Sequence, residues 1–200
     1  MSQGHDVGTT AAYLAYRKAR ERLPGSHAQP VRDREELLFD HWAEADLLLE
    51  ARIGSMRMWA GNERAGAAKP VLDRCLASLK EVRDCLGSLR SVVKVASLTR
   101  PIRIDSPLAL YMTQAYVWAG DVFEDVFARV QQLRGARPAN DSVPDDSATY
   151  VAEFLEPLLL QVGDYHEELR ADPALEPVLP LLIRLRRAIL AVEWSLRTDT

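Results

Sequence analysis

The sequence predicts an all-α protein, an up-and-down antiparallel bundle of about six helices, three of which are long. Apolar residues recur at alternating steps of three and four in five stretches of the 200-residue chain, which is the spacing of one face of an α-helix. Segments with proline, glycine and capping residues separate these stretches. Residues 98–105 alternate briefly as a strand would, but a lone strand has no pairing partner, so we expect an extended connector there.

The apolar series define the expected helix faces, and only the first of them contains a charge. Helices joined by short turns lie antiparallel, and a steady three-four spacing favours shallow, left-handed crossing. In chain order the series are Leu38, Trp42, Ala45, Leu49, Arg52, Met56 and Trp59; Leu72, Cys75, Leu79, Val82, Leu86, Leu89, Val93 and Ala96; Ala109, Met112, Tyr116, Ala119, Phe123, Val126, Val130 and Leu133; Val151, Leu155, Leu158, Val162, Tyr165 and Leu169; and Leu175, Val178, Leu182, Leu185, Ile189, Val192 and Leu196.

Helix boundaries follow from local signals. Ser106 is a good N-cap and Pro107 suits a first helical position, while Gly135 suits a helix end. Pro157 should bend the helix that contains it, because proline lacks an N–H group and crowds the preceding turn. We therefore expect helices over residues 10–23, 33–61, 70–97, 107–134, 148–170 and 178–197.

The fourth of these helices is apolar over a wider arc than the others. A second set of apolar residues, Tyr111, Ala115, Trp118 and Val122, lies beside its main series. A helix that is apolar over a wide arc must be covered on several sides. It is therefore either the central helix of the bundle or a helix that another subunit covers. Gly120, inside it, is expected to permit close approach of a neighbour.

Length and composition indicate one globular domain over residues 1–200, with a flexible N-terminus at residues 1–9 and a surface loop at residues 136–147. Apolar residues make up 48% of the chain, and its net charge is −4. No apolar run is long enough for a transmembrane helix, and no membrane partner is expected. Cys75 and Cys85 lie ten positions apart in one expected helix, too far apart for a disulfide. Free thiols favour a cytoplasmic location.

Basic residues outnumber acidic ones in residues 67–104, whereas acids dominate residues 105–174. Arg83, Arg90 and Lys94 share one helical face, and Arg100 and Arg103 follow in the connector. This set could bind a nucleic-acid backbone, where phosphate contacts dominate affinity. It could equally face acidic helices of the same bundle or of a partner protein.

Arg52 is the charge that interrupts an apolar series, between Leu49 and Met56. Burying an isolated charge is costly. Arg52 is therefore expected either to form a buried ion pair with Asp121 or Asp125, or to lay its stem along the core while its guanidinium reaches solvent.

Few residues suggest catalysis. Arg22 and His27 have the Arg-x4-His spacing of HEPN ribonucleases, which are also helical bundles, and the chain resembles that family in this motif alone. The resemblance implies RNA cleavage by Arg22 and His27. The chain has no Glu-x-x-His pair of the kind that binds iron in helical bundles. No metal or other cofactor is expected.

These observations favour a non-enzymatic helical-bundle interaction module, a subunit or adaptor of a larger intracellular assembly, with a protein partner or homo-oligomerisation. The alternative is a nucleic-acid-contacting subunit that uses the basic face of residues 83–103. A second alternative is a degenerate HEPN-like ribonuclease. The two hypotheses of binding differ in salt dependence, which is steep for a nucleic acid.

Overall fold

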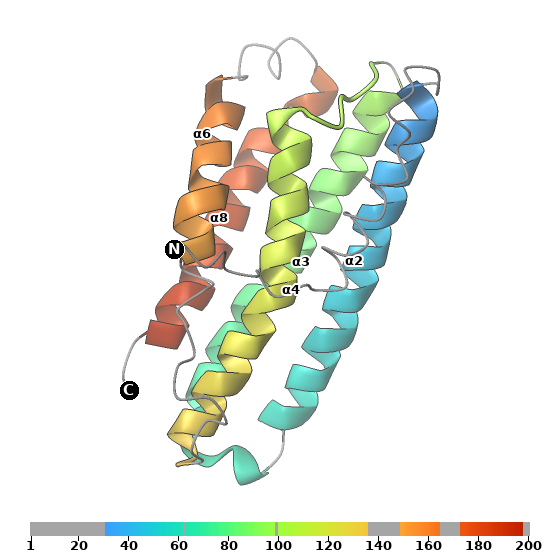
Figure 1. Cartoon of the computed structure of the whole chain (residues 1–200). Helices are drawn as coiled ribbons and strands as arrows, with labels where there is room; N and C mark the ends of the chain where they lie inside the picture. The colour runs from blue at the N-terminus through green and yellow to red at the C-terminus, as the bar shows by residue number, and fades with distance from the viewer. Residues whose placement is uncertain (1–30, 62, 99, 136–148, 165–172, 198–200) are drawn as a thin grey trace, which may run out of the picture.

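The fold is all-α, as the apolar periodicity predicts. The computed structural model describes residues 31–61, 63–98, 100–135, 149–164 and 173–197 (Figure 1). Within these ranges there are five α-helices and no strand. The expected helix at residues 10–23, the N-terminus 1–9 and the loop 136–147 lie outside them, so the count of six stays a prediction. The α-helices are α2 (Val31–Ala60), α3 (Lys69–Ser97), α4 (Pro107–Leu133), α6 (Glu156–Asp164) and α8 (Val178–Arg197).

Consecutive helices run in opposite directions (Figure 1). The three long helices have 30, 29 and 27 residues, which corresponds to about 40–45 Å each at 1.5 Å per residue. Helix α8 packs mainly against α3, and α3 also packs against α2. Helix α6 packs against α4. The predicted up-and-down antiparallel order therefore holds for the described helices.

Helix α4 is the central helix of the described bundle, because it contacts α2, α3, α6 and α8. Both of its apolar sets are covered. Tyr111, Ala115, Trp118 and Val122 are buried, as are most members of the main series. The wide apolar arc is thus explained within the chain, by packing on several sides.

The predicted apolar series form the core. Every member of the α3 series, from Leu72 to Ala96, is buried. In the α8 series the members from Val178 to Val192 are buried, while Leu196 is partly buried against the core. Removing one such leucine side chain is expected to cost about 2–5 kcal/mol of stability, since it loses transfer free energy and leaves a cavity.

The ends of α4 match the local signals. The Ser106 hydroxyl accepts a hydrogen bond from the Ala109 N–H at 3.3 Å, and Pro107 occupies the first turn. Gly135 has a φ of +70° and donates its N–H to the Gln132 carbonyl at 3.0 Å. A left-handed residue here is a common way to end a helix, and glycine adopts it without a Cβ clash.

Pro157 has its effect one turn earlier than the sequence predicts. The preceding segment, η2 (Val151–Leu155), is a π-helix, and the N–H of Glu156 donates to the carbonyl of Val151, five residues back. Proline donates no hydrogen bond and its ring crowds the carbonyl four residues before it. A wider π-turn at this point relieves that crowding, so the chain loosens before Pro157 and continues as α6.

Residues between α3 and α4 form the predicted non-helical connector, and α2 fixes it in place. Glu35 is buried at the start of α2, and its carboxylate accepts a hydrogen bond from the backbone N–H of Ile102. Cys75 and Cys85 are both free and buried, as the helix spacing predicts. Across the described residues, no helix is long and apolar enough to cross a membrane.

Candidate functional site

Two of the five predicted basic residues are used inside the bundle. The Arg83 guanidinium lies 3.1 Å from Oε2 of Glu50 and 3.5 Å from Oδ1 of Asp46, both on α2. Arg90 lies 3.9 Å from Oδ2 of Asp46 and donates to the carbonyl of Trp42 at 3.3 Å. These side chains tie α3 to α2.

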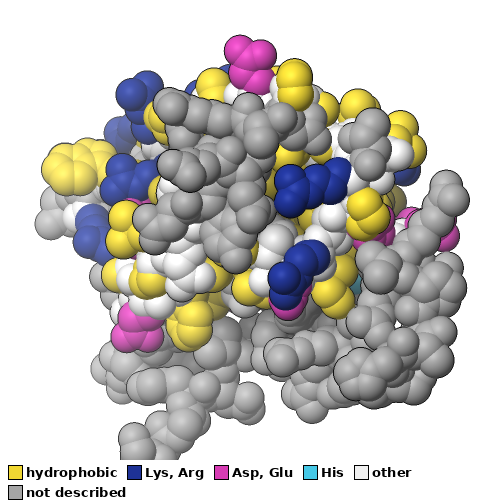
Figure 2. Space-filling model, turned by 90° about the horizontal axis from the view of Figure 1, so that it is seen from above, with side chains coloured by type: hydrophobic (Ala, Val, Ile, Leu, Met, Phe, Trp, Pro, Cys, Tyr) yellow, Lys and Arg dark blue, Asp and Glu magenta, His cyan; other side chains and the backbone are white. Residues whose placement is uncertain are grey.

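The other three basic residues follow Arg83 and Arg90 along the chain and are exposed. Lys94 is exposed near the end of α3, and Arg100 is exposed in the connector. Arg103 forms an exposed ion pair with Asp105 at 2.8 Å. In the view onto the end of the bundle that holds this connector, hydrophobic side chains lie between the Lys and Arg side chains that are visible (Figure 2).

Asp46 takes part in this α2–α3 contact, and the sequence did not identify it as a candidate. Its side chain is only 12% exposed and lies between the two arginines. Asp46 follows Trp42 by four positions and precedes Leu49 by three, so it shares their face of the helix. Tyr116 approaches from α4: burial and the Asp46 charge raise the pKa of its phenol above its ordinary value.

Arg52 contacts α4 through a backbone carbonyl and an aromatic ring, neither of which the sequence predicts. Its guanidinium donates to the backbone carbonyl of Gly120 and lies 5.7 Å from the ring centre of Phe123. Burial raises the pKa of the nearby Asp121 carboxyl to about 7, although the Arg52 charge opposes this shift and Asp125 and Glu124 add to it. Arg52 is half-buried. A backbone carbonyl and an aromatic ring of α4 therefore stabilise its positive charge.

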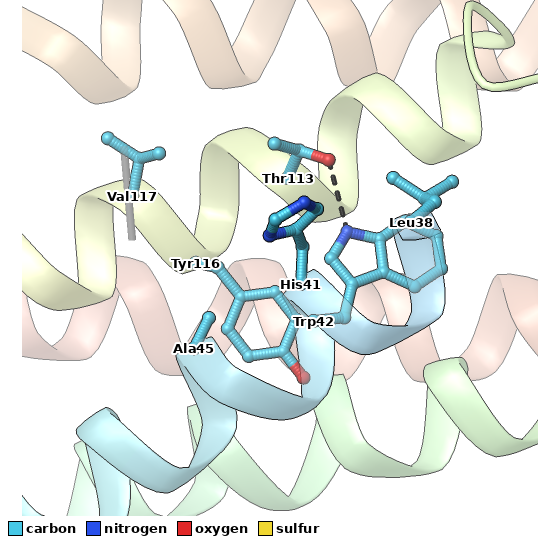
Figure 3. A pocket seen from close by; sticks show the side chains of 7 residues that line it. All are labelled: Leu38, His41, Trp42, Ala45, Thr113, Tyr116 and Val117. Atoms are coloured by element: carbon cyan, nitrogen blue, oxygen red, sulfur yellow. Dashed lines mark hydrogen bonds between the residues drawn. The ribbon is translucent and has the colours of Figure 1, made fainter. Parts of the chain in front are cut away.

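A small cavity lies between α2 and α4, beside Trp42 (Figure 3). The Trp42 indole N–H donates to the Thr113 hydroxyl at 3.1 Å, and that hydroxyl donates to the Ala109 carbonyl at 2.8 Å. The volume is about 10 Å³, which admits one water molecule at most. This cavity has no room for a substrate. Its full lining is Leu38, His41, Trp42, Ala45, Thr113, Tyr116 and Val117.

The described residues contain one histidine, His41 on α2, and it lies beside an acid. His41 Nδ1 lies 3.9 Å from Oε2 of Glu44, but no group of three histidine, cysteine or acidic residues suited to a metal occurs among the residues described. Arg22 and His27, the motif that resembles HEPN ribonucleases, lie outside those residues.

A larger concavity is a groove between α8 and the segment formed by η2 and the start of α6, with a volume of about 470 Å³. Ligand sites typically range from about 300 to 1,000 Å³. Its η2 side contains the π-turn, and π-turns are frequent at functional sites. The lining residues are Val151, Ala152, Glu156, Arg186, Leu190, Glu193, Trp194 and Arg197. Hereafter we call this the α6–α8 groove.

Fixed polar contacts hold the two walls and the floor of the α6–α8 groove. Arg186 of α8 lies 2.9 Å from Oε1 of Glu156 on α6, which bridges the walls. Glu193 is buried and accepts a hydrogen bond from the Trp118 indole at 3.1 Å, and its other oxygen lies 3.7 Å from Arg197. The floor is therefore anchored to the central helix.

Apolar side chains remain exposed at the α6–α8 groove despite these contacts. Trp194 is 70% exposed, and Leu190 is 39% exposed. Phe154 on η2 is also exposed. Sequence reasoning did not predict this groove, because it depends on how far α6 stands from α8. No protein-family model, curated protein or solved structure matches this chain.

Proposed function

We propose that this chain is a non-enzymatic interaction module, a subunit or adaptor of a larger assembly, and that the α6–α8 groove is its contact surface. The observation that supports this most is the exposure of Leu190 and Trp194 beside a groove of about 470 Å³. Tryptophan at the centre of a contact surface is a typical binding hot spot. Exposed apolar groups rimmed by charges are typical of protein-binding sites.

The arrangement of the other polar groups agrees with this proposal. Asp46, Arg83 and Arg90 hold α2 to α3, and Thr113 and Trp42 hold α2 to α4. These groups have structural partners on neighbouring helices. The cavity beside them holds one water molecule at most, so it offers no place for catalysis.

The alternatives have less support. A nucleic-acid contact through the predicted basic face would have to use Lys94, Arg100 and Arg103, because α2 carboxylates hold Arg83 and Arg90. The ribonuclease alternative depends on Arg22 and His27, and loss of RNA cleavage in His27→Ala would be its signature. We place the module in the cytoplasm, in agreement with its two free, buried thiols.

Site-specific photo-crosslinking tests the proposal. A photoreactive phenylalanine analogue replaces Leu190 in the groove, and a matched variant replaces Leu47, which is 65% exposed on α2. We expect a discrete crosslinked protein from position 190 and none from position 47, with loss of the product when Trp194 is also changed to Glu. Identical products from both positions, or none from position 190, would refute the proposed contact surface.

A further inference from the structure

The outward face of α8 is both basic and apolar. Its exposed charged residues are all arginines: Arg184, Arg186, Arg187 and Arg197. The one acidic residue of this helix, Glu193, is buried. The same helix also exposes apolar side chains, namely Ile183 at 53%, Leu190 at 39% and Trp194 at 70%. A partner that covers this face therefore has to match arginine and apolar groups together.

Spacing places these groups along one line. Ile183, Arg187, Leu190 and Trp194 follow one another at steps of four, three and four, so they share one face of α8. Two of the arginines turn sideways to neighbouring helices. Arg184 donates to Glu81 of α3 at 3.0 Å, and Arg186 donates to Glu156 of α6 at 2.9 Å. Arg187 remains on the exposed line between the apolar positions.

The shape of the surface favours a helix as the partner over a flat membrane. The α6–α8 groove is concave, with Val151 on one wall and Leu190 on the other. A flat lipid surface cannot fill a concavity between two helices, whereas the apolar ridge of a helix fits between two others. Binding of an amphipathic helix in an apolar groove is also a common mode of peptide recognition.

We propose that the α6–α8 groove binds an acidic amphipathic helix of a partner protein. Its apolar residues enter between Val151 and Leu190, and its carboxylates lie over the Arg187 guanidinium. The inference rests on the proposed function and adds the chemistry of the partner. Charge complementarity selects the acidic helix. Arg186 and Arg197 of the groove are already paired with Glu156 and Glu193, so Arg187, exposed three positions before Leu190, is the cation that attracts a partner's carboxylates and repels a basic helix.

A designed peptide tests this chemistry with the full chain. The probe is a capped amphipathic helix of about 18 residues, long enough to form helix in water, with leucine at steps of three and four and glutamate on both flanks. The same peptide with lysine in place of glutamate, and a scrambled sequence, are the control probes. Binding is followed by NMR of the tryptophan indole N–H groups, with Trp194 identified from Trp194→Phe.

We expect the acidic peptide to shift the Trp194 indole signal and to leave those of the buried Trp42 and Trp118 nearly unchanged. Arg187→Glu should weaken binding at least about tenfold, as expected for loss and reversal of a facing charge. The matched control Arg57→Glu, an exposed arginine on α2, should leave the affinity unchanged. Equal binding of the lysine or scrambled peptide, or an equal effect of both charge reversals, would overturn the proposal.

Two other occupants give distinct results. Binding to phosphatidylserine vesicles that Arg187→Glu abolishes would overturn the proposal in favour of a membrane surface. A dimer in sedimentation analysis that Leu190→Glu dissociates would overturn it in favour of a second copy of this chain. If the acidic peptide fails while crosslinking at position 190 still gives its discrete protein, the partner chemistry is wrong and the proposed function stands.

Discussion

The indole N–H of Trp118 donates to Oε1 of Glu193 over 3.1 Å, and this bond joins the central helix α4 to the last helix α8. Both residues are buried, Trp118 at 1% exposure and Glu193 at 5%. A buried carboxylate costs free energy unless hydrogen bonds or charges compensate it. Here the indole and Arg197 both do so. The bond therefore couples the core to the floor of the α6–α8 groove.

Glu193→Ala should lower the free energy of unfolding by about 1–3 kcal/mol, because it leaves the buried indole N–H without an acceptor. Glu193→Gln keeps an acceptor oxygen and should lose less. The measurement is urea unfolding followed by circular dichroism. For comparison, Arg197→Ala removes the i,i+4 ion pair to Glu193 and leaves the indole hydrogen bond in place, so it should cost less than Glu193→Ala, about 1 kcal/mol or less. An equal loss in the Ala and Gln variants would show that the hydrogen bond is not the stabilising contact.

Asp46 should be more important for stability than its neighbour Glu50. Asp46→Ala removes the carboxylate that Arg83 and Arg90 share, while Arg83 keeps Glu50 and Arg90 keeps the Trp42 carbonyl, so we expect a loss of about 1–3 kcal/mol. Glu50 is exposed, and Glu50→Ala should cost about 1 kcal/mol or less. Chemical denaturation of both variants, of Arg83→Ala and of the Asp46→Ala/Arg83→Ala double mutant gives the Asp46–Arg83 coupling energy. Strictly additive losses would contradict a direct Asp46–Arg83 interaction.

The sequence predicts the helices well because their signals are local. The α3 series from Leu72 to Ala96 depends only on a period of 3.6 residues, and Ser106 and Gly135 act on their own helix ends. The ion pair of Asp46 with Arg83 depends instead on the register between α2 and α3. The apolar spacing of each helix does not determine that register. The α6–α8 groove depends on the π-turn before Pro157 and on the packing of α6 against α4 and of α8 against α3. Neither is encoded in a short motif.

Asp121 should make the protein less stable as the pH rises from about 4 to about 7. Its folded-state pKa is raised to about 7, chiefly by burial, whereas an unfolded aspartate titrates near 3.9. Between these values the folded state binds more protons than the unfolded state, so the free energy of unfolding falls with pH and levels off above pH 7. Because the carboxyl is partly solvated, we expect a fall of about 1–3 kcal/mol.

Asp121→Asn removes this titration, so it should match the parent near pH 4 and be more stable at pH 8. Unfolding curves at both pH values check the expectation. Asp105→Asn is the matched control, because a hydrogen bond from Arg103 lowers the pKa of that exposed carboxyl; the same change there should not stabilise the protein at pH 8. A parent protein whose stability rises between pH 4 and 7, with no effect of Asp121→Asn, would contradict the assignment.

Both thiols of α3 should resist modification while the protein is folded. Burial raises the pKa of Cys75 to about 12, and burial with the Glu81 charge raises that of Cys85 to about 11. At pH 8 the reactive thiolate would then be about 1 part in 10,000 for Cys75 and 1 in 1,000 for Cys85, against about a quarter for an ordinary cysteine. Reaction with Ellman's reagent should therefore be at least about 100-fold slower in buffer than in urea.

Cys85→Ser and Cys75→Ala isolate each thiol, and Cys75 should react the more slowly of the two. Rapid reaction of Cys75 in the folded protein would show that α3 and α8 separate in solution far more often than their packing implies.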